Sequence, residues 1–228
     1  MKSKDYSLLM DTAAVITGDL IGSTGASTSD VDRAMAALSN AAQTISSWTK
    51  VDTRFTRFRG DGWQVFLSEP SLVFRATLLL LAKLRSEGQG LRTRLSIAVG
   101  PVDRLGKTGL GDAAGTAFTL SGRNLDRMLS FRTFVFTDSR STSEKKDYWK
   151  PATLDLAVWQ ASLWTREQAE AVALAIDMPR PTDAELAERL GISRQAVQSR
   201  LKGSGLMATS RALLAFELDF PWPENKHD

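Results

Sequence analysis

The alternation of β-like and helix-like segments constrains the fold of this chain more than any other sequence feature. Short runs rich in β-branched and aromatic residues cover 13–20, 51–58, 63–67, 92–99 and 131–136. Helices are expected at 30–48, where apolar residues recur every three or four positions, at 70–88 and around 119–128. The resulting order, β-α-β-β-α-β-α-β, predicts an α/β (α+β) fold with an antiparallel or mixed sheet, like a split βαβ unit.

The last third of the chain has a different, helical pattern. Helices are expected at 166–176, 182–190 and 191–202, followed by a further helix or a wing at 206–217. The polar segment 138–150 has the composition of a connection. We therefore expect an α/β domain over 1–137, a linker over 138–163 and a small helical domain over 164–228.

Two residue types that carry much enzyme chemistry are almost missing from this sequence. The chain has 0 cysteines and 1 histidine, His227. Disulfide frameworks, thiolate zinc sites and cysteine nucleophiles are thereby excluded, and a Ser-His-Asp triad or a histidine-rich metal site is disfavoured. Any chemistry must use Asp, Glu, Arg, Lys, Ser and Thr.

Charge and hydropathy place weaker limits on partners and location. The net charge of +3 is too small to indicate nucleic-acid binding by itself, and residues 164–228 hold 8 basic and 10 acidic residues. The first residues lack the apolar stretch of a secretory signal, and no apolar run approaches the length of a membrane span. We expect a cytoplasmic protein that does not associate with a membrane.

Two aspartates mark the ends of predicted strands. Asp19 lies at the end of the first strand, before a glycine-rich turn, and Asp61 lies in a Gly-Asp-Gly hairpin. If the two strands are neighbours, the carboxylates could converge on one Mg²⁺, with the main-chain amides of 20–24 cradling phosphates. The alternative is that both are ordinary turn aspartates, since Asp and Gly are common in turns.

Four short motifs, in order, resemble those of class III nucleotidyl cyclases, which have a ferredoxin-like palm domain. They are Gly-Asp-Leu-Ile-Gly-Ser-Thr at 18–24, Arg-Gly-Asp-Gly-Trp-Gln-Val-Phe at 59–66, Leu-Ser-Ile-Ala-Val-Gly-Pro-Val at 95–102 and Asp-Ala-Ala-Gly-Thr-Ala-Phe-Thr-Leu-Ser-Gly-Arg at 112–123. Small bacterial proteins of the SatD family are similar over the same stretches. The resemblance covers about residues 13–137.

The resemblance implies a role for each matching residue. Asp19, Leu20 and Asp61 would hold two Mg²⁺ or Mn²⁺ ions, which activate the ribose 3′-hydroxyl and neutralise phosphate charge. Arg123 would contact the α-phosphorus as negative charge builds there, and Thr119 takes the ribose-orienting position. The substrate, a nucleoside triphosphate, would be bound by Gly22, Ser23, Thr24, Arg57 and Asp112. The family builds its site between two subunits, so a homodimer is implied.

Two positions depart from the family pattern. Thr119 stands where cyclases have an asparagine, and Arg57 stands where adenine-specific members have a lysine. The first departure keeps open a catalytically silent regulator that only senses the nucleotide, and the second leaves the base undetermined. Arg57, Asp112 and Arg123 could also be ordinary surface residues.

The segment 182–202 resembles a winged or LuxR-type helix-turn-helix. Ala187 is small enough for close helix approach, Gly191 allows a positive φ in the turn, and Val197 can lock the third helix onto the second. The expected reading face, directed to double-stranded DNA, consists of Ser193, Arg194, Gln195, Gln198, Arg200 and Lys202. The alternative is a helical hairpin used for dimer packing. A protein-interaction module in which both motifs have decayed is the third hypothesis for the chain.

Overall fold

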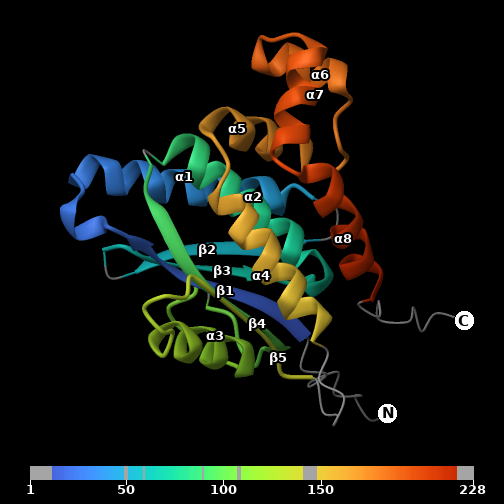
Figure 1. Cartoon of the computed structure of the whole chain (residues 1–228). Coiled ribbons are helices and arrows are strands. Elements are labelled where there is room, and N and C mark those ends of the chain that lie inside the picture. Colours follow the sequence, from blue (N-terminus) through green and yellow to red (C-terminus); the bar gives the residue numbers. More distant parts are fainter. Residues whose placement is uncertain are drawn as a thin grey trace, which may run out of the picture.

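A five-stranded mixed sheet organises the first part of the molecule (Figure 1). The computed structural model describes residues 12–48, 51–58, 60–88, 90–106, 109–140 and 148–219. The strands are β1 (Thr12–Ile21), β2 (Thr53–Phe58), β3 (Gly62–Leu67), β4 (Arg92–Pro101) and β5 (Phe134–Asp138). Their order is β2-β3-β1-β4-β5, with β4 and β5 parallel and all other pairs antiparallel. The expected mixed α/β class and strand order along the chain are therefore confirmed.

Strand alternation assigns the side chains of β1 to two different layers. Ile16 and Leu20 point into the larger core, which also contains side chains of α1 (Thr28–Ser46) and α2 (Val73–Glu87). Val15 points to the other face, where Phe118 of α3 (Thr116–Asp126) belongs to a smaller apolar cluster. We call the two sides the α1/α2 face and the α3 face. Both faces of β1 are covered, which explains why its sequence is apolar without strict alternation.

The segment that joins the sheet to the C-terminal helices contains a helix that the sequence did not predict. Within the expected linker, α4 (Trp149–Ser162) contacts α2 and β5, and it buries Leu154 and Val158. The remaining helices are α5 (Arg166–Ala175), α6 (Asp183–Leu190), α7 (Arg194–Gly203) and α8 (Leu206–Asp219). The region 206–217, predicted as a helix or a wing, is therefore a helix.

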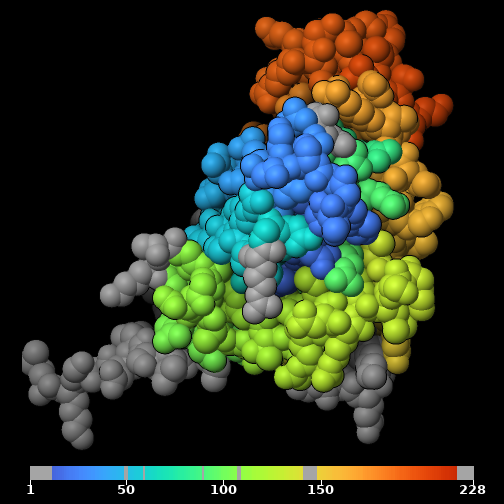
Figure 2. Space-filling model, turned by 90° about the vertical axis from the view of Figure 1, so that its left-hand side faces the viewer, coloured from blue at the N-terminus to red at the C-terminus, as the bar shows by residue number. Residues whose placement is uncertain are grey.

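The C-terminal helices share a core with the sheet layer. One cluster of buried residues extends from β1 through α2 to Phe216 of α8. Arg75 of α2 forms an ion pair with Glu217 of α8 (Nε–Oε1 2.7 Å), and α5 packs directly on α2. Figure 2 shows α6 and α7 projecting from the end of the molecule opposite α3. Among the described residues, no helix is both long and apolar enough to cross a membrane.

Candidate functional site

Strand register brings the two predicted metal aspartates to the same end of the sheet. Asp19 lies opposite Gly62 of β3, the residue that follows Asp61. The amide of Leu20 donates a hydrogen bond to the carbonyl of Asp61 (3.1 Å), which fixes the β2–β3 hairpin beside the end of β1. Asp19 shares the α3 face with Thr17, since successive side chains alternate along a strand. The structure thus places Asp19 and Asp61 on adjoining chain segments.

Two consecutive hydrogen bonds on the α1/α2 face of the sheet hold the main chain of Asp19 in place. The buried indole of Trp63 donates to the Thr93 hydroxyl (3.1 Å), which in turn donates to the carbonyl of Asp19 (2.6 Å). The Trp63 ring crosses β1 at Gly18, where an added Cβ would lie 2.4 Å from a ring atom. A side chain at position 18 would therefore displace the ring, which explains why a glycine precedes Asp19.

The Asp19 carboxylate is paired with an arginine that the sequence reading did not single out. Arg94 lies opposite Asp19 on β4, and its Nε and Nη2 atoms donate to the two carboxylate oxygens at 2.8 and 2.6 Å. These hydrogen bonds raise the pKa of the Arg94 guanidinium above its usual value, and the nearby charges of Asp126 and Asp61 add to the effect. Pairing the ends of the first and fourth predicted strands would have revealed this contact.

The glycine-rich turn after β1 is joined to the hairpin. Gly22 adopts a left-handed conformation (φ 83°) and is followed by a short 3-10 turn, Ser23–Gly25. The Ser23 hydroxyl donates to Asp61 Oδ2 at 2.5 Å, while Thr24 is exposed. The predicted phosphate-binding turn therefore lies next to Asp61.

Helix α3 covers the α3 face, but two further predicted residues lie on the side of this helix that faces away from the sheet. Its Ser121 accepts a hydrogen bond from Thr17 of β1 (2.8 Å), which fixes the helix on the sheet. Thr119 and Arg123, one turn apart, are exposed on its outer side. The Arg123 side chain has no hydrogen bond or ion pair with the part of the chain that the structure describes.

The structure does not bring Arg57 to the carboxylates. Arg57 pairs with Trp63 and shares its face of the sheet, the α1/α2 face, whereas Asp19 is on the α3 face. Its guanidinium binds the Asp32 carboxylate of α1 and the carbonyl of Gly60, both at 2.7 Å. Arg57 therefore has the contacts of a residue that holds the hairpin to α1.

Asp112 lies on the loop between β4 and α3, and this loop contacts β2. The loop is tied to the α3 face by the amide of Leu110, which donates to Thr56, and by Arg54, which donates to the carbonyl of Gly106. The Asp112 side chain is exposed, and the main-chain carbonyl of Asp112 accepts a hydrogen bond from Arg104 Nε (2.9 Å). Among the described residues, no hydrogen bond or ion pair joins Asp112 to Asp19 or Asp61.

The donor set fits a divalent cation that shares its coordination with a substrate. Within the described ranges, no three acidic or histidine side chains gather closely enough to hold an ion on their own. Asp19 and Asp61 supply two carboxylates, and Mg²⁺ is commonly bound by one or two carboxylates together with phosphate oxygens and water. The arrangement therefore suits a metal that arrives with a phosphorylated ligand better than a resident structural ion.

The second candidate site is the helix pair α6–α7. Thr182 caps α6 in a reciprocal capping box with Glu185. The Thr182 amide donates a hydrogen bond to the Glu185 carboxylate, and this bond lowers the pKa of the Glu185 carboxyl. Gly191 ends α6 in the left-handed conformation (φ 65°), and Ser193 then caps α7 by accepting from the amide of Ala196. Val197 of α7 is buried, and α6 and α7 pack against each other across this turn.

The exposed face of α7 contains most of the predicted DNA-reading residues. Ser193, Arg194, Gln195, Gln198 and Lys202 are all exposed. Gln198 donates to Asp183 of α6 (3.2 Å), whereas Arg200 is turned toward α5, where it pairs with Glu170 (3.5 Å). Arg200 is therefore set apart from the exposed face.

Comparisons with known proteins complete the description of these sites. No protein-family model matches the chain, and no curated protein matches it. The assignment of function therefore depends on the geometry of the two sites.

Proposed function

We propose that the sheet domain binds a nucleoside triphosphate together with Mg²⁺ or Mn²⁺ at the end of β1. The observation that carries this proposal is the juxtaposition of Asp19 and Asp61 beside the Gly22 turn, fixed by the Leu20–Asp61 hydrogen bond. Carboxylates supply hard oxygen ligands, and the turn offers main-chain amides to the phosphates. The family resemblance of the four sequence motifs supports the same ligand.

The candidate reaction is cyclisation of the nucleotide. The ribose 3′-oxygen attacks the α-phosphorus in line and loses its proton to solvent water, while the bond to the pyrophosphate leaving group breaks. A bound divalent cation lowers the pKa of the 3′-hydroxyl and neutralises phosphate charge. Arg123 is exposed and can stabilise the charge that builds on the transferred phosphorus. In a homodimer, Thr119 and Arg123 of one copy would act on the nucleotide held by the other.

Nucleotide binding is tested by calorimetry with each of the four nucleoside triphosphates, in Mn²⁺ and in EDTA. The wild type should bind at least one nucleotide only when the metal is present. Asp61→Asn should abolish this binding, while the control Asp52→Asn, an exposed aspartate before β2, should leave it unchanged. Absence of metal-dependent binding in the folded wild type would overturn the proposal.

Turnover is tested in the same samples. Release of a cyclic nucleotide and pyrophosphate identifies a nucleotidyl cyclase, and loss of product in Arg123→Ala with binding retained assigns the arginine to the reaction. Metal-dependent binding without product identifies the catalytically silent nucleotide sensor instead.

We propose as a second function that α7 binds double-stranded DNA. The observation that favours it is the Gly191–Ser193 turn followed by a helix whose exposed face carries Arg194, Gln195 and Lys202. Guanidinium, amide and ammonium groups can donate to base edges or phosphates in the major groove. Its position at one end of the molecule leaves this helix accessible (Figure 2).

Selection from a random duplex library, followed by mobility shifts at several salt concentrations, tests DNA binding. Lys202→Ala should weaken binding and reduce the slope of log K against log[salt] by about 1, whereas Arg211→Ala on α8 should change neither. No enrichment and no shift at moderate salt would exclude this function.

A further inference from the structure

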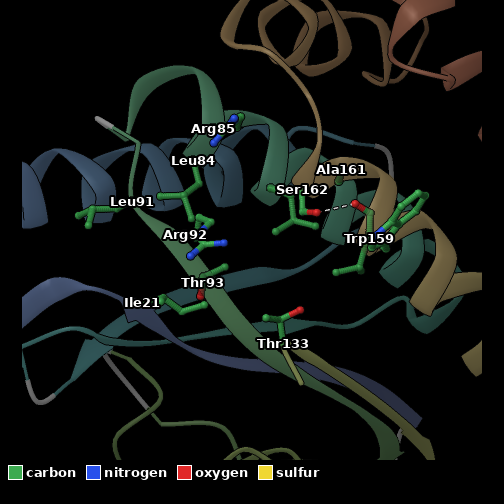
Figure 3. A pocket seen from close by; sticks show the side chains of 12 residues that line it. Ile21, Leu84, Arg85, Leu91, Arg92, Thr93, Thr133, Trp159, Ala161 and Ser162 are labelled. Atoms are coloured by element: carbon green, nitrogen blue, oxygen red, sulfur yellow. Dashed lines mark hydrogen bonds between the residues drawn. The ribbon is translucent and has the colours of Figure 1, made fainter. Parts of the chain in front are cut away.

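A cavity lies beside α2, where β1 ends and β4 begins, and Asp19 is not among its lining residues. It is enclosed by the end of α2, the start of β4 and the end of α4, and its volume is about 260 Å³ (Figure 3). Most of its wall is apolar, with side chains of Ile21, Leu84, Leu91, Val158 and Trp159. The cavity is therefore a place where α4 and the sheet domain leave unfilled apolar space.

The polar groups of this cavity are not equivalent. Arg85 is already engaged, because its Nε donates to the carbonyl of Trp164 (2.8 Å). The Thr93 hydroxyl is fully used between Trp63 and Asp19, and the Ser162 hydroxyl donates to the carbonyl of Trp159 (2.6 Å). Three polar side chains of this wall, Arg85, Thr93 and Ser162, therefore already form hydrogen bonds within the protein.

Thr133 and Arg92 are the exceptions among the described residues, and of the two only Arg92 carries a charge. Arg92 is exposed, and its guanidinium has no hydrogen-bond or ion-pair partner among the described residues. Figure 3 shows its side chain between Leu84 of α2 and Thr93 of β4. A cation at the opening of an apolar cavity attracts an anion whose remaining atoms can fill the cavity.

We propose that this cavity binds a small monocarboxylate with an apolar body, such as a medium-chain aliphatic acid. The carboxylate pairs with the Arg92 guanidinium, and the hydrocarbon part lies against Leu84, Leu91 and Val158. At about 30 Å³ for each non-hydrogen atom, the volume suits a ligand of roughly eight to ten such atoms. A phosphate ester is a poorer match, because most of the wall is apolar and a doubly charged group would lose much of its hydration there.

The inference does not depend on nucleotide or DNA binding. Ile21 and Thr93 lie next to the nucleotide site and line the cavity, but Asp19 and Asp61 and the exposed residues of α7 are not among its lining residues. The ligand would contact α2, β4 and α4 at once, so binding should stabilise the attachment of α4 to the sheet domain.

Calorimetry and thermal unfolding of the full chain with octanoate, octylamine and octanol test the proposal. Octanoate should bind and raise the melting temperature, whereas octylamine should not bind. Arg92→Gln should weaken octanoate binding about tenfold or more and remove its preference over octanol. Arg166→Gln, an exposed arginine on α5, serves as the matched control and should bind as the wild type does.

A space-filling variant separates specific binding from general hydrophobic association. Val158→Trp places a large ring in the cavity, and it should abolish octanoate binding while the unliganded protein retains a cooperative unfolding transition. If the protein fails to fold, Leu91→Trp at the half-buried rim serves instead. Failure of octanoate to bind the wild type, or equal binding by wild type and Arg92→Gln, would overturn the proposal.

Discussion

Arg94 and Asp19 form a two-point ion pair across β1 and β4, with the guanidinium donating to both carboxylate oxygens. The positive charge also lies within range of the Asp61 and Asp126 carboxylates. Arg94 therefore already neutralises part of the negative charge to which we propose that a divalent cation binds. A cation that coordinates Asp19 must share this carboxylate with the guanidinium or displace it.

The first prediction concerns this competition. Arg94→Gln removes one positive charge and frees both Asp19 oxygens, so Mn²⁺ binding should tighten by about tenfold. Because the ion pair is only part-buried, the variant should lose no more than about 1 kcal/mol of folding stability. Calorimetric titration with MnCl₂ measures the affinity, and urea unfolding measures the stability.

A matched variant distinguishes local competition from a change in overall charge. Arg166→Gln removes an exposed arginine on α5 and should leave Mn²⁺ affinity unchanged. Weaker Mn²⁺ binding in Arg94→Gln would mean that Arg94 orients Asp19 for the metal instead of competing with it.

The second prediction concerns the turn between α6 and α7. Gly191→Ala puts a Cβ on a residue with φ of 65°, and no atom lies within 4 Å of the added carbon, so the cost is conformational. The variant should lose roughly 1–2 kcal/mol of folding stability. Gly122→Ala, also with open space around the added carbon but within α3, should instead gain about 0.5–1 kcal/mol. Urea unfolding compares the two, and an equal effect of both substitutions would contradict the role assigned to Gly191.

The third prediction concerns the attachment of the C-terminal helices. The buried indole of Trp48, at the end of α1, donates to Asp177 between α5 and α6 (2.8 Å). Asp177→Ala leaves this N–H unpaired and should cost about 1–3 kcal/mol. Because the core is continuous, denaturant should unfold the chain in one transition, monitored by both fluorescence and circular dichroism.

A double-mutant cycle isolates the contribution of this hydrogen bond. In a Trp48→Phe background no indole N–H remains, so Asp177→Ala should cost clearly less than in the wild type. Two separate transitions would show that the C-terminal helices unfold independently of the sheet. Equal costs of Asp177→Ala in both backgrounds would show that the hydrogen bond from Trp48 does not contribute to stability.

The sheet could be predicted from the sequence because its strands have local signals. The hairpin around Asp61 and the turn after Asp19 are marked by glycines, and the segment order then restricts which strands can be neighbours. Helix α4 was missed because its apolar residues do not lie on one side: Leu154 and Val158 are buried, but Leu156 and Trp159 are exposed. A periodicity argument requires a single apolar stripe, which α4 lacks.

The candidate site was predictable only in part, for a similar reason. Asp19 and Asp61 follow from motifs and neighbouring strands, whereas the partner of Arg57 depends on which face of β2 its side chain occupies. That face is set by the register with Trp63, and a shift of one residue would have reversed it. The contribution of Arg94 likewise requires the β1–β4 register, which joins residues 75 positions apart.

The last prediction concerns Asp155 on α4. Although Asp155 is exposed, desolvation of its carboxyl by the surrounding chain raises the pKa above the ordinary 3.8, against the opposing influence of Arg132. The folded state therefore binds the proton more tightly than the unfolded chain, so this group favours folding below pH 3.8 and loses that contribution as pH rises through the raised pKa. Asp155→Asn, which cannot ionise, should match the wild type in melting temperature near about pH 3 and exceed it at pH 7. Arg132→Gln should raise the Asp155 pKa further, as a carboxyl-detected NMR titration would show; a pKa below 3.8 in the wild type would contradict this account.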